Sequence, residues 1–167
     1  MTYAPRGRHF EEFTVGEAFT TAARTVTEGA VDSFAGLSGD FNPLHTDEEL
    51  SRQGPTKGRI AHGMLVLAVA TGQANQLGIF EGTTLALLGM DKIRWTAPVR
   101  LGDTIHTVLT VRETRASSKP DRGVVVMEVA VRNQRGETVC QAEWTTLMTR
   151  RRGTNGSTGS ATATGSR

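Results

Sequence analysis

The strongest hydrophobic pattern lies near the middle of the chain, where apolar residues recur at helical spacing from about residue 62 to residue 77. In the first half of this segment, including the run Met64–Ala70, every side of the helix is apolar. A helix without a polar face must be surrounded by protein. The run is also far too short to span a bilayer. The pattern therefore predicts a helix buried inside a folded domain that does not enter a membrane.

Alternating apolar and polar positions after this helix predict a series of β-strands. The candidate strands cover residues 84–94, 105–111, 125–131 and 137–149. The turn-forming segment Pro98–Asp103 separates the first two strands. The residues of Asn133–Gly136 are typical of a hairpin turn and precede the last strand. The positions expected to face inward in the two middle strands are Ile105, Thr107, Leu109, Val111, Val125, Met127, Val129 and Val131. We expect four successive antiparallel strands.

The chain before the central helix offers one more strand and one more helix. Residues 18–26 are rich in threonine and form a strand candidate. Thr27 can cap a following helix, and Gly39 marks the end of its apolar pattern. Residues 39–45 are expected to be irregular, because Asn42 precedes a proline and is pushed out of the helical region. A short acidic turn is expected at residues 47–50.

This order of elements predicts an α+β protein in which an antiparallel sheet wraps around one long central helix, the hotdog fold. A sheet of four or five strands leaves edges and apolar surface, and a second copy could cover both by pairing edge to edge. We therefore expect a homodimer or a dimer-based higher oligomer. The domain should span residues 18–150, after an N-terminal arm of residues 1–17 anchored by Phe10 and Phe13. Residues 151–167 are rich in glycine, serine and threonine, and we expect a disordered tail.

Composition narrows the classes of function. The formal net charge is +2, from 19 basic and 17 acidic residues, and no stripe of basic and aromatic residues is present, so no nucleic-acid partner is expected. No apolar segment follows the N-terminal charges, so no signal peptide is expected. The single cysteine, Cys140, excludes an internal disulfide and suits the cytoplasm. Cys140 shares a strand face with Ala142 and Trp144, which favours a buried apolar residue over a nucleophile.

Several common catalytic patterns are absent from the sequence, namely the nucleophile elbow, the phosphate-binding glycine loop and the Cys-x-x-Cys pair. The histidines His9, His45, His62 and His106 lack the spacing of metal ligands on one helix or hairpin, so no metal site is expected. His106 lies on the outward side of its strand and should be exposed. Catalytic residues are therefore expected in the segment that precedes the central helix.

Asp40 and His45 are the first candidates, because a carboxylate and an imidazole joined by a stiff proline-containing loop can hold one water from two sides. One group can take a proton from the water while the other orients it. The alternative is that Asp40 only forms a turn ahead of Asn42 and Pro43, while His45 fills a gap. Spacing alone leaves both interpretations open.

Gly63 is the second candidate, because it lies at the start of the predicted central helix. A helix N-terminus presents free N–H groups and partial positive charge, and glycine lets a ligand approach them closely. Such a site could hold a thioester oxygen as it becomes an enolate. Alternatively, Gly63 only relieves crowding where the helix meets the sheet. The sequence does not decide between the two.

Three blocks of sequence resemble one family. Phe34–Asp47 (FAGLSGDFNPLHTD) resembles the signature of the MaoC-like, (R)-specific enoyl-CoA hydratase family. Ile60–Leu65 resembles the start of that family's central helix, and Pro98–Asp103 resembles its later turn. The blocks occur in the family's order and cover most of residues 10–150. The first block is long and specific.

The resemblance implies a hydro-lyase of fatty acid metabolism. An acyl-CoA is the implied substrate, and the implied reaction is the reversible syn hydration of a trans-2-enoyl-CoA to an (R)-3-hydroxyacyl-CoA. It implies that Asp40 and His45 activate the water and that the Gly63 N–H lies near the thioester oxygen. Asn42, Pro43 and His62 would support the loop or the substrate. No redox or metal cofactor is implied.

Two other functions stay open, an acyl-CoA thioesterase and a non-catalytic acyl-CoA binding protein, because a fold alone does not determine function. The sequence does not reveal the preferred acyl chain or which member of the catalytic pair is the formal base. Nor does it choose among the cations that could bind the CoA phosphates. These are Lys57, Arg59, Lys92, Arg94 and the cluster at Arg150.

Overall fold

A computed structural model describes residue 4 and residues 6–151 of the chain. The helical elements are η1 (Phe10–Glu12), α1 (Glu28–Ser38), α2 (Pro43–Thr46), α3 (Glu48–Gln53) and α4 (Gly63–Gln76). The strands are β1 (Ala18–Thr20), β2 (Arg24–Thr25), β3 (Thr84–Trp95), β4 (Thr104–Ala116), β5 (Arg122–Asn133) and β6 (Thr138–Thr149). Apart from Arg151, the predicted tail lies outside the described residues. None of the described helices is long and apolar enough to cross a membrane.

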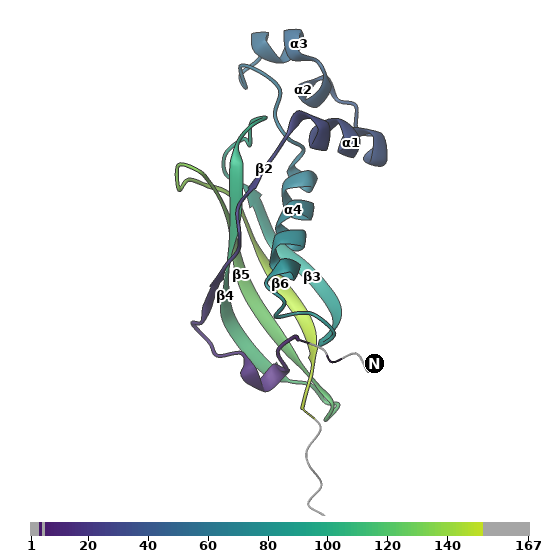
Figure 1. The fold of residues 1–167 in the computed structure, drawn as a ribbon, viewed down its shortest axis with the longest axis vertical. Coiled ribbons are helices and arrows are strands. Elements are labelled where there is room, and N and C mark those ends of the chain that lie inside the picture. The colour runs from purple at the N-terminus through teal and green to yellow at the C-terminus, as the bar shows by residue number, and fades with distance from the viewer. Residues whose placement is uncertain (1–3, 5, 152–167) are drawn as a thin grey trace, which may run out of the picture.

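The strands form one antiparallel sheet in the order β1-β4-β5-β6-β3, and β2 also pairs with β4. Figure 1 shows α4 lying along the curved sheet, with α1, α2 and α3 gathered at one end of the molecule. The predicted α+β hotdog architecture is confirmed. The four successive antiparallel strands are present as predicted, but their order in the sheet is not their order along the chain, because β3 pairs with β6 rather than with β4. Alternation along a strand identifies its buried face but not the strand with which it pairs.

The hydrophobic core lies between α4 and the sheet. Every inward position predicted for the two middle strands is buried. One prediction about α4 is wrong for the single chain, because one stripe of this helix is not covered. Met64 is 57% exposed, and Ala68, Gly72 and Asn75, which follow at intervals of three or four residues, are exposed as well. The helix is therefore packed against its own sheet on one side and open on the other.

One buried polar side chain in α4, Gln73, explains why the predicted strand of residues 18–26 is interrupted. Its Nε2 donates to the carbonyl oxygens of Ala22, at 3.0 Å, and Ile105, at 2.8 Å. Its Oε1 accepts a hydrogen bond from Thr107 Oγ1 at 2.8 Å. The carbonyl of Ala22 is thus bonded to the helix in the gap between β1 and β2. Both amide hydrogens and the amide oxygen of Gln73 thus have partners inside the core.

The described part of the N-terminal arm packs onto the domain through the two predicted anchors. Phe13 is 5% exposed and belongs to the core. Phe10 covers Gly123 of β5 so closely that a methyl group there would come within 2.3 Å of the ring. Both anchoring predictions are confirmed.

Cys140, on β6, is fully buried together with its neighbours on the same face, Ala142 and Trp144. Burial raises the pKa of the Cys140 thiol to about 11. The prediction that this cysteine is a buried apolar residue is therefore confirmed.

Candidate active site

The segment between α1 and α4 carries the predicted catalytic pair and is more regular than expected. Gly39 ends α1 in the left-handed region, with φ of 77°. Asn42 then caps the single turn α2, because its Oδ1 accepts the N–H of Leu44 at 3.1 Å. Pro43 takes the first helical position, where a missing N–H costs nothing. The expectation that residues 39–45 are irregular is thus wrong from Pro43 onward, and His45 lies on this turn.

The expected acidic turn at residues 47–50 is also the beginning of a helix, α3. Asp47 caps it, because its Oδ1 accepts the N–H of Leu50 at 3.0 Å. Ser51 of α3 donates from its hydroxyl to the carbonyl oxygen of Pro43 at 2.9 Å. This bond holds α3 against α2 and so supports the turn that carries His45.

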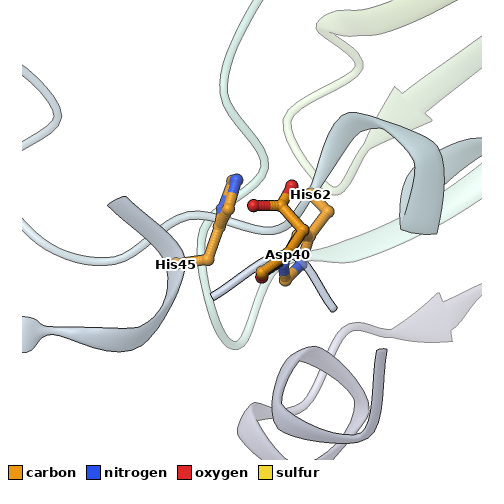
Figure 2. A group of neighbouring side chains, drawn as sticks. All are labelled: Asp40, His45 and His62. Carbon is orange, nitrogen blue, oxygen red and sulfur yellow. Dashed lines mark hydrogen bonds between the residues drawn. The ribbon is translucent and has the colours of Figure 1, made fainter. Parts of the chain in front are cut away.

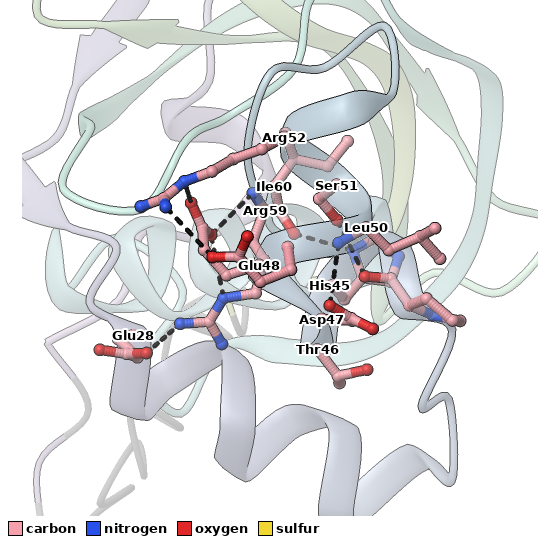
Figure 3. A network of polar contacts seen from close by, with 12 residues as sticks. Glu28, His45, Thr46, Asp47, Glu48, Leu50, Ser51, Arg52, Arg59 and Ile60 are labelled. Carbon is pink, nitrogen blue, oxygen red and sulfur yellow. Dashed lines mark hydrogen bonds and ion pairs between the residues drawn. The ribbon is translucent and has the colours of Figure 1, made fainter.

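Arg59 joins α1 and α3 to the segment that leads into α4. Its guanidinium forms ion pairs with Glu28 and Asp32 of α1 and with Glu48 of α3; Figure 3 shows it beside Glu28 and Glu48. The backbone N–H of Arg59 also donates to Glu48 Oε2 at 3.2 Å. That backbone hydrogen bond is the main cause that holds the pKa of Glu48 below its usual value. Arg59 thus links α1 and α3 through a single cation.

Asp40, His45 and His62 come together in front of α4 (Figure 2). Each offers one carboxylate oxygen or ring nitrogen, and these three atoms lie within 4.8 Å of one another. Asp40 is exposed, whereas His45 and His62 are only 8% and 2% exposed. The structure therefore brings the predicted pair together and adds His62, which precedes α4, as a third member.

Hydrogen bonds to backbone carbonyls determine which ring nitrogens are free. His45 Nδ1 lies 2.8 Å from the carbonyl oxygen of Ile60, and His62 Nε2 lies 3.0 Å from that of Asp40. A carbonyl oxygen only accepts, so each of these nitrogens carries a proton. In the neutral rings, His45 Nε2 and His62 Nδ1 are then acceptors. His62 Nδ1 is buried and has no hydrogen-bond partner within residues 4 and 6–151.

One carboxylate and two imidazoles are also a possible set of metal ligands, which the sequence spacing did not suggest. The rings of His45 and His62 are stacked, with centroids 3.8 Å apart and planes 27° apart. The lone pair of an imidazole nitrogen lies in the ring plane, so two stacked rings direct their lone pairs side by side rather than at one point. The arrangement suits a water or a substrate oxygen better than one ion. The absence of a resident metal stays a prediction.

A cavity of about 460 Å³ opens beside these side chains. Its wall comes from residues 44–45, from residues 60, 61, 63, 64 and 66 around the start of α4, and from residues 95–99, which begin at the last residue of β3. His45 and Gly63 both line it, and most of the other lining residues are apolar, which is typical of a site for a small ligand. Asp40 is not part of the wall, but its carboxylate lies within 4.8 Å of a ring nitrogen of His45, which is.

Gly63, the first residue of α4, has a role in packing. A methyl group there would come within 2.6 Å of Trp95 Cε2 and Nε1, so the indole needs a glycine at this position. This contact supports the interpretation that Gly63 relieves crowding. The oxyanion role of its N–H is compatible with that packing, because His62 gives the start of α4 no side-chain cap. Trp95 was missed by the sequence analysis, since a strand pattern does not show what the last side chain contacts.

The turn of residues 98–103 is held by Asp103, a residue that is 5% exposed. Its carboxylate accepts hydrogen bonds from the N–H of Arg100 at 2.8 Å and from Gln134 Nε2 at 2.6 Å. Burial acts to raise the pKa of Asp103, but the bonds from Gln134 and Arg100 and the charge of Arg135 outweigh it and lower the pKa. Asp103 is thus a structural carboxylate that fixes one wall of the cavity.

Known proteins resemble this chain in sequence. The family described as "MaoC like domain" matches residues 10–133. Protein MaoC of Klebsiella aerogenes is 33% identical over 108 residues, 65% of this chain but 32% of that protein. The chain thus spans about a third of the length of that relative. The (R)-specific enoyl-CoA hydratase of Rhodospirillum rubrum is 36% identical over 107 residues, 62% of this chain and 69% of that enzyme.

Solved structures resemble it as well. The MaoC-like dehydratase from Rhodospirillum rubrum has a TM-score of 0.76 and 31% identity, over 87% of this chain and 99% of that chain. A Mycobacterium tuberculosis protein described as a double hotdog fold has a TM-score of 0.77 and 22% identity, over 89% of this chain and 46% of that chain. At that identity the likeness concerns the fold alone, and it agrees with the architecture described above.

Proposed function

Because the chain belongs to the MaoC-like domain family, we propose that it catalyses the reversible syn hydration of a trans-2-enoyl-CoA to an (R)-3-hydroxyacyl-CoA. One observation carries this proposal. A carboxylate oxygen of Asp40 and a ring nitrogen of His45 lie within 4.8 Å of each other, and His45, whose Nε2 is free, lines an apolar cavity together with Gly63. The relatives named hydratase and dehydratase support the same class of reaction, a lyase reaction on a thioester.

In the hydration direction, Asp40 and His45 hold one water between them. As the water oxygen forms a bond to C3 of the enoyl thioester, one of the pair accepts a proton from it. The electron pair of the C2–C3 double bond moves toward the thioester carbonyl, and the negative charge gathers on its oxygen. A proton is then delivered to C2 on the same face, and the carbonyl re-forms. Asp40 and His45 thus divide two tasks between them, orienting the water and taking its proton.

The Gly63 N–H stabilises the enolate oxygen in this mechanism. The first N–H groups of a helix have no acceptor inside the helix, and the helix dipole places partial positive charge there. A preorganised donor aimed at a developing negative charge stabilises the transition state more than the substrate, which raises kcat.

The neighbouring residues position the pair. The N–H of Asn42 donates to Asp40 Oδ1 at 3.2 Å, which leaves the other carboxylate oxygen free for the water. Pro43 starts the turn that carries His45, and His62 holds the backbone carbonyl of Asp40. Each contact reduces the freedom of a group that must meet the water at a defined angle.

Ion pairing narrows the choice of cations for the CoA phosphates. Arg59, Lys92 and Arg150 are each paired with carboxylates. Lys57 and Arg94 form no ion pair within the described part of the chain, and both lie close in sequence to residues that line the cavity. Lys57 and Arg94 are therefore the proposed phosphate ligands. Replacing either with alanine should raise KM for crotonyl-CoA but not for crotonyl-N-acetylcysteamine, which has no phosphate.

The proposed oligomer is a homodimer formed through β3. This strand ends the sheet, and Leu85, Leu87 and Leu88 on it are 47%, 47% and 54% exposed. Exposed apolar side chains along an unpaired strand edge favour pairing with a second copy. Leu87→Glu should yield a monomer by light scattering, whereas Val15→Glu, at an equally exposed position outside β3, should remain a dimer.

The deciding experiment follows loss of the enoyl thioester absorbance of crotonyl-CoA. Asp40→Asn and His45→Ala should each lower kcat by on the order of 10²–10⁴-fold, while both variants stay folded and dimeric. Asp121→Asn and His106→Ala are matched controls, because they remove the same groups outside the site. Near-normal turnover in either site variant would refute the mechanism, and release of free CoA thiol would instead indicate a thioesterase.

A further inference from the structure

Trp95 occupies a position that the proposed mechanism has not used. It is the last residue of β3 and lines the cavity together with His45 and Gly63. The pyrrole edge of its indole rests on Gly63, since a methyl group on that residue would lie 2.6 Å from Nε1 and Cε2 and 3.1 Å from Cδ1. Only a glycine lets the ring come this close to the helix. The indole therefore lies directly against the start of α4.

This contact places the indole on the side of the helix where its free N–H groups are. In an α-helix each Cα–Cβ bond tilts toward the N-terminus, so a ring at the place of a missing Cβ lies toward that end. The first N–H groups point the same way and have no acceptor inside the helix. His62, at the capping position, provides no side-chain acceptor for them. The Gly63 N–H and the Trp95 indole consequently border the same part of the cavity.

The indole Nε1–H is itself an unused donor. Trp95 is 49% exposed, and among residues 4 and 6–151 its Nε1–H has no hydrogen-bond acceptor. An indole nitrogen only donates, so any group that it binds must be an acceptor. Gly63 and Trp95 thus bring two N–H donors to the wall of one cavity, one from the backbone and one from a side chain.

We propose that the Trp95 Nε1–H is a second donor to the thioester oxygen of the substrate, beside the Gly63 N–H. This inference rests on the proposed hydration of an enoyl thioester. As water adds to C3 and the electron pair moves onto the carbonyl oxygen, both donors strengthen their bonds to that oxygen. When C2 takes its proton, the charge leaves the oxygen and both bonds weaken again. Trp95 is then a catalytic residue that contacts the substrate and exchanges no proton with it.

The kinetic test is Trp95→Phe, which keeps an aromatic ring against Gly63 and removes the N–H. We expect kcat for crotonyl-CoA to fall by on the order of 10²-fold, as for the loss of one oxyanion donor elsewhere. KM should change much less, because the lost interaction is strongest in the transition state. Trp144→Phe is the matched control, since Trp144 is buried and does not line this cavity. The control should keep the kcat of the unchanged protein.

A binding test supports the kinetic one, because the chain has only two tryptophans. In Trp144→Phe, all tryptophan fluorescence comes from Trp95. Titration with butyryl-CoA, which has no double bond to hydrate, should change that emission in a saturable way. No change would overturn the proposal, even if Trp95→Phe failed to fold.

The outcomes separate this inference from the function on which it rests. Normal or increased kcat in Trp95→Phe, with an active unchanged protein, would overturn the role of Trp95 and leave the hydration intact. Failure of the unchanged protein to hydrate any enoyl-CoA would overturn both.

Discussion

Two buried polar side chains of the central helix region, Gln73 and His62, behave in opposite ways. Gln73 is 3% exposed and all the hydrogen-bonding groups of its amide have partners. His62 is 2% exposed, yet its Nδ1 has no partner among the described residues. A buried polar group without a partner costs about 1–3 kcal/mol relative to one that is paired. The protein tolerates that cost at one end of α4 and avoids it further along the same helix.

The difference separates the part of the molecule that holds the fold from the part that binds. Around Gln73 the polar groups satisfy one another and leave nothing for a ligand. Around His62 several groups are left available, including a free nitrogen on His45, an exposed Asp40 carboxylate and an uncapped helix start. Two of these groups, the free nitrogen of His45 and the start of α4 at Gly63, belong to residues that line the cavity, as expected of a ligand site.

The largest expected effect is on catalysis by His62→Phe. Phenylalanine can keep the stack on His45 but loses the hydrogen bond to the Asp40 carbonyl. A small displacement of Asp40 should lower kcat on crotonyl-CoA by on the order of 10²-fold. The free energy of unfolding should change by only about 1 kcal/mol, because removal of the unpartnered Nδ1 offsets part of the loss of that hydrogen bond. Urea unfolding and steady-state kinetics measure both quantities. A variant that loses stability but keeps kcat would place His62 with the structural residues.

Gln73→Leu should have the opposite pair of effects to His62→Phe, a clear loss of stability without a loss of kcat. It leaves the carbonyls of Ala22 and Ile105 and the hydroxyl of Thr107 without their partner in the core. We expect the free energy of unfolding to fall by about 2 kcal/mol, while kcat of the folded protein stays unchanged. Urea unfolding at fixed protein concentration provides the comparison. A large loss of kcat in a stably folded Gln73→Leu protein would remove the distinction between the two regions.

Arg59→Met tests the link between α1 and α3. The three carboxylates that it meets are 39–63% exposed, so solvent weakens each pair. The free energy of unfolding should fall by about 1 kcal/mol at low salt, and the difference from the unchanged protein should shrink as salt is added. Salt-dependent thermal unfolding measures this. An effect that does not change with salt would point to packing of the side chain rather than to its charge.

The smallest effect is the pH dependence contributed by Asp103. Its pKa is lowered in the folded state, so its contribution to stability is complete above the unfolded value of about 3.9. The contribution is lost as the pH falls through the lowered pKa. Asp103→Asn should therefore flatten the decline of unfolding free energy in this acidic range. An unchanged slope would assign that decline to other carboxylates.

The elements that could be predicted from the sequence are those that show a periodic pattern or a capping residue within a few neighbouring positions. The alternation in β4 and β5 and the helical spacing of α4 follow from periodic burial, and Thr27 does cap α1, accepting the N–H of Ala30 at 3.2 Å. The single turn α2 was missed, because four residues are too few to show a period. The pairing of β3 with β6 was missed because the residue pattern of a strand does not indicate which other strand it pairs with.

The site could be predicted only in part, because some of its residues are neighbours in the sequence and others are not. Asp40 and His45 stand in one short block, so a resemblance of that block to a family could indicate both. The stack of His62 on His45 and the contact of Trp95 with Gly63 join residues far apart in the chain. Contacts of that kind depend on the completed fold, and no local pattern encodes them.

The burial of Cys140 also prevents a side reaction between its thiol and the thioester substrate proposed for this protein. Burial raises the pKa of Cys140 to about 11, so its thiol is protonated at neutral pH. A thiolate on the surface could attack an acyl-CoA and carry away its acyl group as a protein thioester. Here the only sulfhydryl of the chain is kept protonated and enclosed in the core, so bound thioesters meet no competing thiol from the protein itself.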